Sequence, residues 1–496
     1  MLDYVRNGQD PGRRVATRRP QPLVDQFANY HAAVKWLKGN IRGPAEGTLP
    51  RPQLSLEERH RRRFLRMRAF LQRLGDPQRD FAAVHVAGTS GKGSTCAMLA
   101  AIGAASGRRT GLHVSPYLQT PLEKLVVNNR LMNVGRFVCL VERFRQYVAA
   151  FNADSPHGLL RYGEIWVSLT FAAYAAERVD LGIVEVGSGG RWDYTNVLMP
   201  DVAVINRIGM DHVRTLGPTL ADIAGHKAGI IKPGIPVVVA EQPADALAVV
   251  KAEASAQGAP LVLAGRDFAW EIEHRASDGA HFTYTDRDVR WSHLVVPLLG
   301  DHQVANAALA IAAARRLHRG APVDEAAVRQ GLAHVRFAGR LERMQGAPEV
   351  LLDGAHNVQK AAALASALQQ LRQGRRLVLV LGILASHAPQ GIVELLAPLA
   401  NAVICTAPKV IGKPAYPADE LASLCRHFCS QVEARPGPVA ATRRAMTVAG
   451  KSGVVCVCGS LYLVGAVRGI WQSEADLLRS AWQDAEDPLP LATAAL

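Results

Sequence analysis

The sequence predicts an α/β protein, with a mostly parallel sheet covered by helices and a smaller α/β unit after it. Short β-branched runs alternate with helical stretches along most of the chain, as expected for parallel strands joined by helices. A second series of such runs begins near Gly339. The 496 residues are enough for about two to four domains, so each unit is long enough to bury a core.

The first unit is expected to begin with helices and to continue as an alternation. Helical patterns cover 27–37 and 56–74, with a Gly/Pro-rich connector at 39–52 between them. Strands are expected at 81–88, 181–186, 202–205, 235–240 and 261–264. Antiparallel strands are expected within 282–299, and helices at about 304–317 and 323–332 close the unit.

The second unit repeats the alternation over a shorter length. Its strands are expected at 350–353, 377–381, 402–406 and 454–458, with helices between them. These patterns divide the chain into a disordered basic tail at 1–25, a first domain at 26–338, a second domain at 339–480 and a tail at 481–496.

The composition predicts a folded cytoplasmic protein. Hydrophobic residues make up 49% and charged residues 20% of the chain, which is close to the average of globular proteins. No apolar run has the ~18–20 residues of a membrane span, and the first residues lack the apolar segment of a secretory signal. Seven cysteines are too few for a disulfide framework. A metal cluster of Cys425, His427, Cys429, Cys456 and Cys458 is the less favoured alternative to structural cysteines.

The net charge of +14 raises the question of nucleic-acid binding. Much of the excess is local, in the arginines of the first 25 residues and in the run RHRRRFLRMR at 59–68. A run at helical spacing is more often a solvated helix face, and no nucleic-acid motif accompanies it. Anionic small substrates explain a basic field equally well, so we expect neither a nucleic-acid nor a membrane partner.

The strongest local motif is HVAGTSGKGSTCAML at 85–99, an apolar strand followed by a Gly-rich turn and a helix. Gly88, Gly91 and Gly93 would let backbone N–H groups approach phosphates, and Lys92 would supply a cation. Ser94 or Thr95 would place a hydroxyl on magnesium. The general G-x-x-x-x-G-K-[ST] pattern is not met, because Val86 stands at the first glycine position and Gly93 follows the lysine. A phosphate loop is favoured over a structural turn.

Two further segments carry candidate functional side chains. Glu185 lies in an apolar strand before a Gly-rich turn at 187–190, where α/β sheets place ligands; the alternative is a buried carboxylate paired with an arginine. His212 follows the strand at 202–205 and could bind a metal, although such a histidine is more often packed or solvent-bound. Lys227 lies in a helix whose opposite face is apolar, and burial would lower its pKa.

Together the motifs resemble the folylpolyglutamate synthase and dihydrofolate synthase family of the Mur ligase superfamily. The resemblance runs from about Asn29 to Arg468. It rests on the ordered segments LGDPQRDFAAVHVAGTSGKGS, EVGSGGRWDYTN, DHVRTLG, HKAG, GDHQVANAALAI, RFAGRLE, DGAHN and CGSLYLVGAVR. It implies a Mur-ligase-like P-loop domain with a central, mostly parallel sheet and a smaller Rossmann-like α/β C-terminal domain.

The resemblance also implies the roles of individual residues. The catalytic residues would be Lys92, Lys227, His212 and Arg340. ATP would bind at Gly88, Thr89, Ser90, Gly91, Lys92, Gly93, Ser94, Thr95, Asn306, Arg340, Asp353 and His356, with His302 and Gln303 nearby. Two Mg²⁺ ions would be held by Ser94, Glu185, His212 and Lys227, the last as a carbamate. The acceptor would lie near Ser115, Pro116, Tyr117 and Lys124.

The implied reaction is an ATP-dependent amide ligation. A folate or dihydropteroate carboxylate attacks the γ-phosphate to form an acyl phosphate, and the amino group of L-glutamate then displaces phosphate. Positioning and charge neutralisation would supply most of the catalysis. Domain closure about the linker at 337–341 would keep water from the acyl phosphate. We expect a monomer that binds these small molecules.

Several positions depart from the family pattern. In the acceptor segment SPYLQTPLEKLVVNNRLM, Tyr117 stands for a histidine and Lys124 for an arginine. Phe337 and Ala338 stand for Trp-Pro, and Val358 for a proline. The alternatives are a Mur-type ligase that acts on another carboxylate, such as a cell-wall precursor, and a nucleotide-binding protein without ligase activity.

Overall fold

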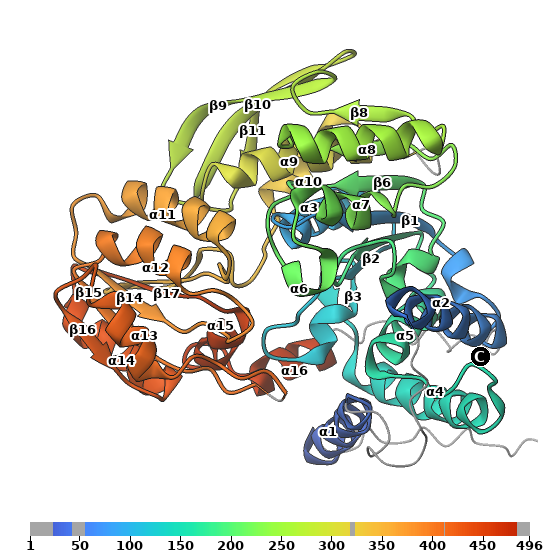
Figure 1. Cartoon of the computed structure of the whole chain (residues 1–496), viewed down its shortest axis with the longest axis horizontal. Helices are drawn as coiled ribbons and strands as arrows, with labels where there is room; N and C mark the ends of the chain where they lie inside the picture. The colour runs from blue at the N-terminus through green and yellow to red at the C-terminus, as the bar shows by residue number, and fades with distance from the viewer. Residues whose placement is uncertain (1–22, 42–54, 318–322, 411, 484–496) are drawn as a thin grey trace, which may run out of the picture.

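The computed structural model describes residues 23–41, 55–317, 323–410 and 412–483. Within them the chain forms sheets of eight, three and six strands, with helices on both faces of the two larger sheets (Figure 1). The predicted fold class is therefore confirmed. The predicted tails lie largely outside the described residues, and α1, Leu23–Gly39, begins four residues before the expected helix.

The eight-stranded sheet has the order β4-β3-β2-β5-β1-β6-β7-β8. Strands β2, β5, β1, β6, β7 and β8 are parallel, whereas β3 and β4 form an antiparallel edge. The strands are β1 (Ala82–Ala87), β2 (Thr110–His113), β3 (Val126–Val127), β4 (Arg130–Leu131), β5 (Leu181–Glu185), β6 (Val202–Ile205), β7 (Val237–Val239) and β8 (Leu261–Leu263). The five strands predicted here are confirmed, but β2, β3 and β4 were missed because none is a β-branched run of four or more residues.

Alternate residues of β1 point to opposite faces of this sheet. Val84 and Val86 pack into the core formed with α3, α9 and α10, whereas Ala83 belongs to the core formed with α1, α2, α4 and α5. The helices of this unit are α1, α2 (Leu56–Arg73), α3 (Lys92–Ala105), α4 (Val134–Asp154), α5 (Tyr162–Ala176), α6 (Val213–Leu216), α7 (Leu220–Ala228), α8 (Ala244–Ala256), α9 (His302–Ala314) and α10 (Glu325–Ala333). Every strand residue of β1 is buried, so this strand is the centre of the unit.

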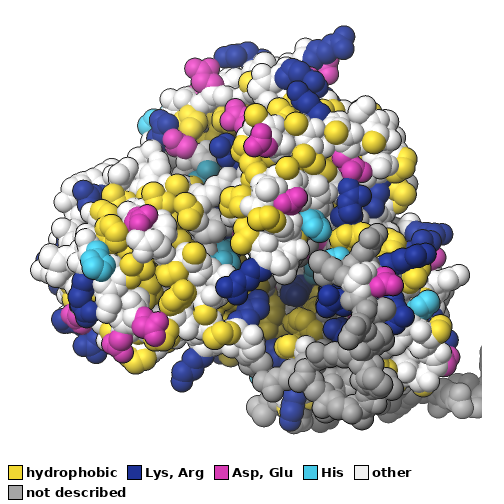
Figure 2. Space-filling model, in the orientation of Figure 1, with side chains coloured by type: hydrophobic (Ala, Val, Ile, Leu, Met, Phe, Trp, Pro, Cys, Tyr) yellow, Lys and Arg dark blue, Asp and Glu magenta, His cyan; other side chains and the backbone are white. Residues whose placement is uncertain are grey.

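The basic run on α2 is not wholly a solvated face. Arg61 and Arg62 are exposed, as expected, but Arg66 is buried. Its guanidinium forms a bidentate pair with Glu164 on α5, at 2.8 and 3.1 Å. Because Glu164 is fully buried, this arginine neutralises a carboxylate in the core and so ties α2 to α5. Figure 2 shows the remaining Lys and Arg side chains spread over the visible face, with several near its central hollow.

A three-stranded antiparallel sheet follows β8 and packs against α9. Its strands are β9 (Phe268–Ala276), β10 (Gly279–Asp286) and β11 (Arg290–Val296), in the order β11-β10-β9. The antiparallel strands predicted within 282–299 correspond to β10 and β11. Strand β9 was missed although Phe268, Trp270 and Ile272 alternate with polar residues, which is the period of a strand with one buried face.

The six-stranded sheet has the order β12-β13-β17-β14-β15-β16, and only β12 is antiparallel to its neighbour. Its strands are β12 (Glu342–Gly346), β13 (Glu349–Leu352), β14 (Leu377–Leu381), β15 (Ala402–Cys405), β16 (Val432–Ala434) and β17 (Val454–Cys458). Its helices are α11 (Val358–Arg372), α12 (Gln390–Leu396), α13 (Ala418–Cys425), α14 (Pro438–Ala449) and α15 (Leu461–Arg468). The four predicted strands are confirmed, and the short strands β12 and β16 were missed.

The chain then returns to the first unit. Helix α16, Glu474–Gln483, lies against α4, where the Asn133 side chain donates a hydrogen bond to the Ala481 carbonyl at 3.3 Å. We propose the predicted division at 338/339, because no strand pairing among the described residues crosses it. The helix ends two residues beyond 481, where the C-terminal tail was expected to begin.

The structure bears on two expectations from the sequence, that no segment spans a membrane and that the cysteines are structural. None of the described helices is both long and apolar enough to cross a membrane. The described residues hold no group of three or more His, Cys, Asp or Glu side chains suited to a metal ion, so the cysteine cluster is not a metal site. Instead Cys425 packs in the core with its Sγ 3.7 Å from that of Cys405, and Cys456 and Cys458 are buried on β17.

We expect His85 on β1 to make the fold sensitive to acid. Burial lowers the pKa of its imidazole to about 3, and its Nε2 lies 2.8 Å from the Thr195 hydroxyl. In the unfolded chain this side chain is protonated below pH ~6.5, whereas in the folded chain it stays neutral. Its contribution to the free energy of unfolding is therefore fully present above that pH and is lost as the pH falls toward 3. When the pH is lowered from 7.5 to 5, the free energy of unfolding of His85→Gln should rise by about 2 kcal/mol relative to that of the wild type.

Urea denaturation of both proteins at the two pH values measures this difference, because contributions from all other groups cancel between them. A difference that does not change with pH would show that His85 is charged in the folded protein.

Candidate active site

The loop at 88–91 joins the carboxyl end of β1 to the first turn of α3. Gly88 and Gly91 have φ values of +141° and +86°, which side-chain-bearing residues rarely adopt. A Cβ on Gly88 would stand 2.6 Å from the Cβ of Asn206, which follows β6. The backbone N–H groups of Thr89 and Ser90 donate to the Arg207 carbonyl at 3.0 and 3.3 Å. The loop is thus held closely against the end of β6, as a loop that presents N–H groups to an anion requires.

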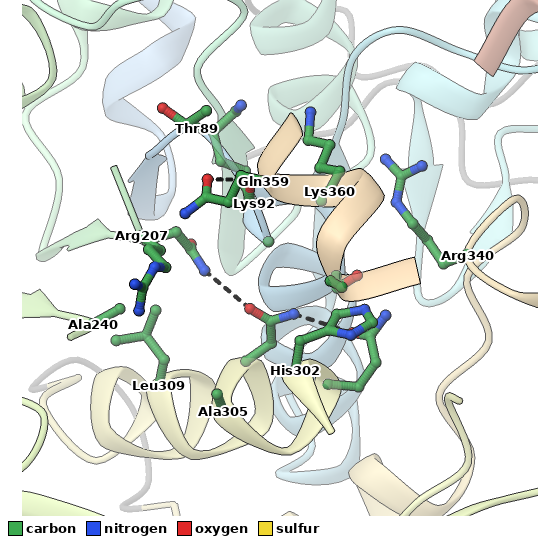
Figure 3. A pocket seen from close by; sticks show the side chains of 18 of the residues that line it. Thr89, Lys92, Arg207, Ala240, His302, Ala305, Leu309, Arg340, Gln359 and Lys360 are labelled. Atoms are coloured by element: carbon green, nitrogen blue, oxygen red, sulfur yellow. Dashed lines mark hydrogen bonds between the residues drawn. The ribbon is translucent and has the colours of Figure 1, made fainter. Parts of the chain in front are cut away.

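A cavity of about 420 Å³ opens in front of this loop (Figure 3). Of the residues predicted from the sequence, those that line it are Thr89, Ser90, Gly91, Lys92, Gly93, Ser94, Glu185, His302, Gln303, Asn306, Arg340 and Asp353. Gly88, Thr95, His212, Lys227 and His356 are not among its lining residues. The structure therefore brings most of the predicted nucleotide site together around one cavity.

Glu185 ends β5, the neighbour of β1, and points into the phosphate-loop end of the cavity. Its Oε1 lies 3.7 Å from the Lys92 Nζ, and its Oε2 accepts a hydrogen bond from the Ser115 N–H at 2.9 Å. The partner of this buried carboxylate is thus a lysine of the loop, not the arginine of the alternative interpretation. The carboxylate is held at the loop by two independent contacts.

A chain of amide groups connects the loop to α9. The Asn206 Nδ2 donates to the Thr95 hydroxyl at 2.9 Å and to the Asn306 Oδ1 at 3.3 Å. The Asn306 Nδ2 donates in turn to the Gln303 Oε1 at 3.1 Å. Thr95 is fully buried and holds Asn206 in place, so its hydroxyl does not face the cavity. Sequence reasoning missed Asn206, whose only signal is its place after a predicted strand.

The far end of the cavity is mostly apolar, with Arg207 beside Ala240 as a charged exception (Figure 3). It is formed where β7, β8, β9 and α9 meet, by Ala240, Ala264, Phe268, Trp270 and Leu309. Small and flat side chains of this kind leave a slot for a planar ring, and aromatic faces stack with such rings. The sequence analysis identified none of these residues, although the alternation of Phe268 and Trp270 marks them as the buried face of a strand.

The opposite wall comes from the linker and from the C-terminal unit. Asp353 follows β13, and its carboxylate accepts hydrogen bonds from the N–H groups of Leu341 at 2.9 Å and Ala355 at 2.8 Å. Its burial raises the pKa of this carboxyl. The Arg340 guanidinium lies 5.5 Å from the centre of the Phe337 ring, which itself packs against the loop at Gly93. The linker therefore reaches the phosphate loop directly.

Two hydrogen bonds join the units across the cavity. The Ser90 hydroxyl donates to the Gln359 Oε1 on α11 at 2.7 Å. The Asn357 Nδ2, at the N-terminus of α11, donates to the Asp211 Oδ2 at 3.3 Å. Figure 3 shows Gln359 and Lys360 on the α11 wall of the cavity. These contacts bridge the two units at the cavity.

His356 faces away from the predicted nucleotide site. Its Nδ1 lies 2.7 Å from the Gly354 carbonyl, and its Nε2 lies 2.9 Å from the Lys360 Nζ. Burial lowers the pKa of this imidazole. Lys360 lies between His356 and the cavity and lines the cavity. Sequence reasoning did not identify this lysine.

Lys227 and His212 lie behind the phosphate loop. The Lys227 side chain is 4% exposed, and its Nζ donates to the Gly88 carbonyl at 2.9 Å. Burial, aided by the positive charge of Lys92, lowers the pKa of Lys227 to about 7. His212 has a φ of +51° and its ring centre lies 6.3 Å from that of His387. Burial lowers the pKa of His212 as well.

These residues fit the predicted magnesium and carbamate chemistry. An uncharged, buried amine beside the loop is the form that reacts with carbon dioxide, and hydroxyl, carboxylate and carbamate oxygens suit Mg²⁺. Such a site also needs phosphate oxygens and water, because a bound Mg²⁺ ion usually keeps several of its water ligands. A site of this kind agrees with the finding that the described residues hold no group of three or more His, Cys, Asp or Glu side chains suited to a metal ion.

The predicted acceptor segment forms an aromatic enclosure. The Lys124 ammonium lies 5.1 Å from the Trp166 ring centre, 5.6 Å from that of Tyr162 and 5.9 Å from that of Tyr117. Burial lowers the pKa of Lys124 to about 8. Pro116 lines a second cavity of about 660 Å³, which meets the first at Arg340; Ser115, Tyr117 and Lys124 do not line it.

Known proteins resemble this chain over most of its length. The family described as Mur ligase middle domain matches residues 86–314, and that described as Mur ligase, glutamate ligase domain matches residues 339–461. A dihydrofolate synthase/folylpolyglutamate synthase of Mycobacterium tuberculosis is 37% identical over 356 residues, which are 69% of this chain and 73% of that protein. The protein of the same name from Bacillus subtilis is 32% identical over 449 residues, 89% of this chain and 99% of its own.

A solved structure shares the fold. It is that of a folylpolyglutamate synthase of Mycobacterium tuberculosis complexed with ADP, and it superposes with a TM-score of 0.81 at 31% identity. The match covers 90% of this chain and 99% of that one. The resemblance inferred from the ordered motifs is therefore confirmed.

We expect the loop to tolerate no side chain at its first glycine. In Gly88→Ala the new Cβ would meet the Cβ and backbone of Asn206 at a φ that only glycine adopts readily. The variant should lose at least ~2 kcal/mol of stability. Gly225→Ala on α7 is the matched control: a Cβ there meets nothing within 4 Å, and a helix interior favours alanine. Chemical denaturation of the two variants measures both effects, and an unchanged Gly88→Ala would contradict the close packing of the loop.

Proposed function

This chain belongs to the dihydrofolate synthase/folylpolyglutamate synthase family of Mur ligases, and from that premise we propose how its residues carry out the reaction. The protein is an ATP-dependent ligase that joins L-glutamate to a folate-type carboxylate. The observation that carries the assignment to this site is the phosphate loop facing Arg340 and Asp353 across one cavity. The relatives' names do not favour the alternative of a cell-wall ligase.

The phosphates of ATP bind at the loop end of the cavity. The N–H groups at the N-terminus of α3 would face them, and Lys92 would supply a positive charge. Ser94 would hold one Mg²⁺ ion and Glu185 and His212 a second, with a carbamylated Lys227 as a further metal ligand. Bound Mg²⁺ would neutralise the charge of the phosphates. Support for this arrangement is the placement of Glu185 against Lys92, at 3.7 Å.

The adenine ring occupies the apolar end of the same cavity. Trp270 and Phe268 offer aromatic faces there, and Asn306 and Gln303 offer amide groups between the two ends. A cavity of about 420 Å³ is within the range of nucleotide and cofactor sites. Asp353, held by two backbone N–H groups, would contact the ribose or a magnesium-bound water.

Attack of the acceptor carboxylate on the γ-phosphate gives an acyl phosphate and ADP. The amino group of L-glutamate then attacks the acyl carbon, and phosphate leaves as the amide forms. Water would destroy the acyl phosphate, so the units must be closed at this stage. The hydrogen bonds of Ser90 with Gln359 and of Asn357 with Asp211 support closure about the linker.

The acceptor is proposed to bind near Ser115 to Lys124, as a dihydropteroate, a reduced folate or both. The predicted cytoplasmic location, monomeric state and absence of nucleic-acid binding stay predictions.

We expect purified protein with Mg-ATP and L-glutamate to add one glutamate to a pteroate compound. Mass spectrometry of parallel reactions with dihydropteroate, tetrahydrofolate and a UDP-muramoyl precursor reports both the reaction and its acceptor. Lys92→Met should slow ADP formation at least ~10²-fold, because the loop loses its cation. Glutamate addition to the muramoyl compound alone would contradict the proposal.

We expect Lys227 to carry a carbamate when carbon dioxide is present. Its neutral Nζ attacks the carbon of CO₂ and releases one proton, which its pKa of about 7 permits near neutral pH. Protein equilibrated with ¹³C-bicarbonate should show a carbamate signal by NMR that Lys227→Met removes. The matched control is Lys232→Met, which removes a second lysine whose pKa burial lowers, to about 8, and which should leave the signal. A signal that survives Lys227→Met would place the carbamate elsewhere.

A further inference from the structure

A lysine outside the predicted motif roles lines the cavity from the C-terminal side. Lys360 lies in the first turn of α11, and its side chain is one of those that border the cavity (Figure 3). It belongs to a different unit from Lys92, which lines the cavity from the N-terminal side. Arg340 borders the same cavity from the linker. Three cationic side chains from three segments of the chain therefore converge on one space.

Of these three cations, Lys92 already lies beside a carboxylate, with its Nζ 3.7 Å from the Glu185 Oε1. None of the ion pairs in the described part of the chain includes Lys360 or Arg340, and the Lys360 Nζ instead lies 2.9 Å from the imidazole Nε2 of His356. Burial lowers the pKa of Lys360 to about 7; the positive charges of Lys92 and Arg340 act in the same direction, and the carboxylates of Asp211 and Glu185 oppose them. Converging cations that repel one another are costly unless an anion binds among them.

The hydrogen bonds of His356 show how Lys360 is held. An imidazole N–H is needed to donate to the Gly354 carbonyl, so Nδ1 carries the proton. Nε2 is then an acceptor, and the Lys360 Nζ, 2.9 Å away, donates to it. One donor of the amine is used in this way, and the others remain for a ligand in the cavity.

We propose that Lys360 binds the γ-phosphoryl group of ATP during its transfer, with His356 as its positioning residue. The proposal rests on the proposed function and adds a cation to it. Lys92 approaches the phosphates from the loop, and Lys360 approaches from α11. The transferred group would thus be surrounded by charge that neither unit supplies alone.

This arrangement links closure to chemistry. Lys360 can reach the γ-phosphoryl group only when α11 is docked on the loop, a position supported by the Ser90–Gln359 hydrogen bond one residue away. Charge that moves onto the leaving and attacking oxygens is stabilised by fixed cations, and removal of one such contact typically costs ~10²–10³-fold in rate. An open enzyme would bind ATP and transfer its phosphoryl group slowly.

The test compares Lys360→Met with Lys360→Arg, which keeps the charge. We expect Lys360→Met to lower kcat for ADP formation ~10²-fold and to weaken binding of ATP while leaving the affinity for ADP unchanged, since ADP lacks the group that the lysine contacts. Lys360→Arg should lie within ~10-fold of the wild type. The control is Lys451→Met, which removes an exposed positive charge from the same unit and should change neither quantity.

His356 is tested in combination with Lys360. His356→Ala should lower the ratio of ATP affinity to ADP affinity, by less than Lys360→Met does. In a Lys360→Met background it should not lower this ratio further, because His356 acts through that lysine. Isothermal titration with ADP and with a non-hydrolysable ATP analogue measures this split in each variant.

Three results would overturn the proposal: an equal loss of ADP and ATP affinity, a rise in KM for L-glutamate with kcat unchanged, or wild-type kinetics in Lys360→Met. Failure of the proposed function is a separate outcome. In that case no pteroate product forms with the wild type, whereas the dependence of the ATP-to-ADP affinity ratio on Lys360 is still measurable.

Discussion

The site depends on three neighbouring parallel strands that end at one edge of the central sheet. Val86 of β1 is in register with Glu185 at the end of β5, and Ala87 with Ile205 at the end of β6. The residues that follow these strands therefore meet: the phosphate loop, the Glu185 carboxylate and Asn206. The loop approaches β6 so closely that only glycine fits at position 88, and this contact sets where its N–H groups point.

The second constraint is electrostatic, and it explains why one unit is not enough. The phosphate end of the cavity receives Lys92 from the loop, Arg340 from the linker and Lys360 from α11. Positive groups at such spacing repel, so the closed arrangement needs compensation. Hydrogen bonds from Ser90 and Asn357 supply part of it, and a polyanionic ligand would supply the rest.

Sequence patterns predicted the parts of this arrangement that are local. A β-branched strand, a Gly-rich turn and a helix are visible within fifteen residues, so the phosphate loop and most strands could be identified. Contacts between distant segments left no such signal. Arg66 resembles its exposed neighbours until Glu164, far along the chain, is seen beside it. The orientation of His356 depends on the Gly354 carbonyl and on Lys360, and the apolar end of the cavity depends on β9 packing against α9.

The two departures in the acceptor segment are one physical change. Tyr117 and Lys124, which replace a histidine and an arginine of the family pattern, contact each other, with the ammonium 5.9 Å from the ring centre. A histidine there could be protonated and would then repel the lysine, whereas a tyrosine ring is neutral and attracts a cation through its π-face. The compact ammonium also fits among three rings, which the larger, planar guanidinium would fill differently. Both replacements therefore serve one enclosure, which Tyr162 and Trp166 complete.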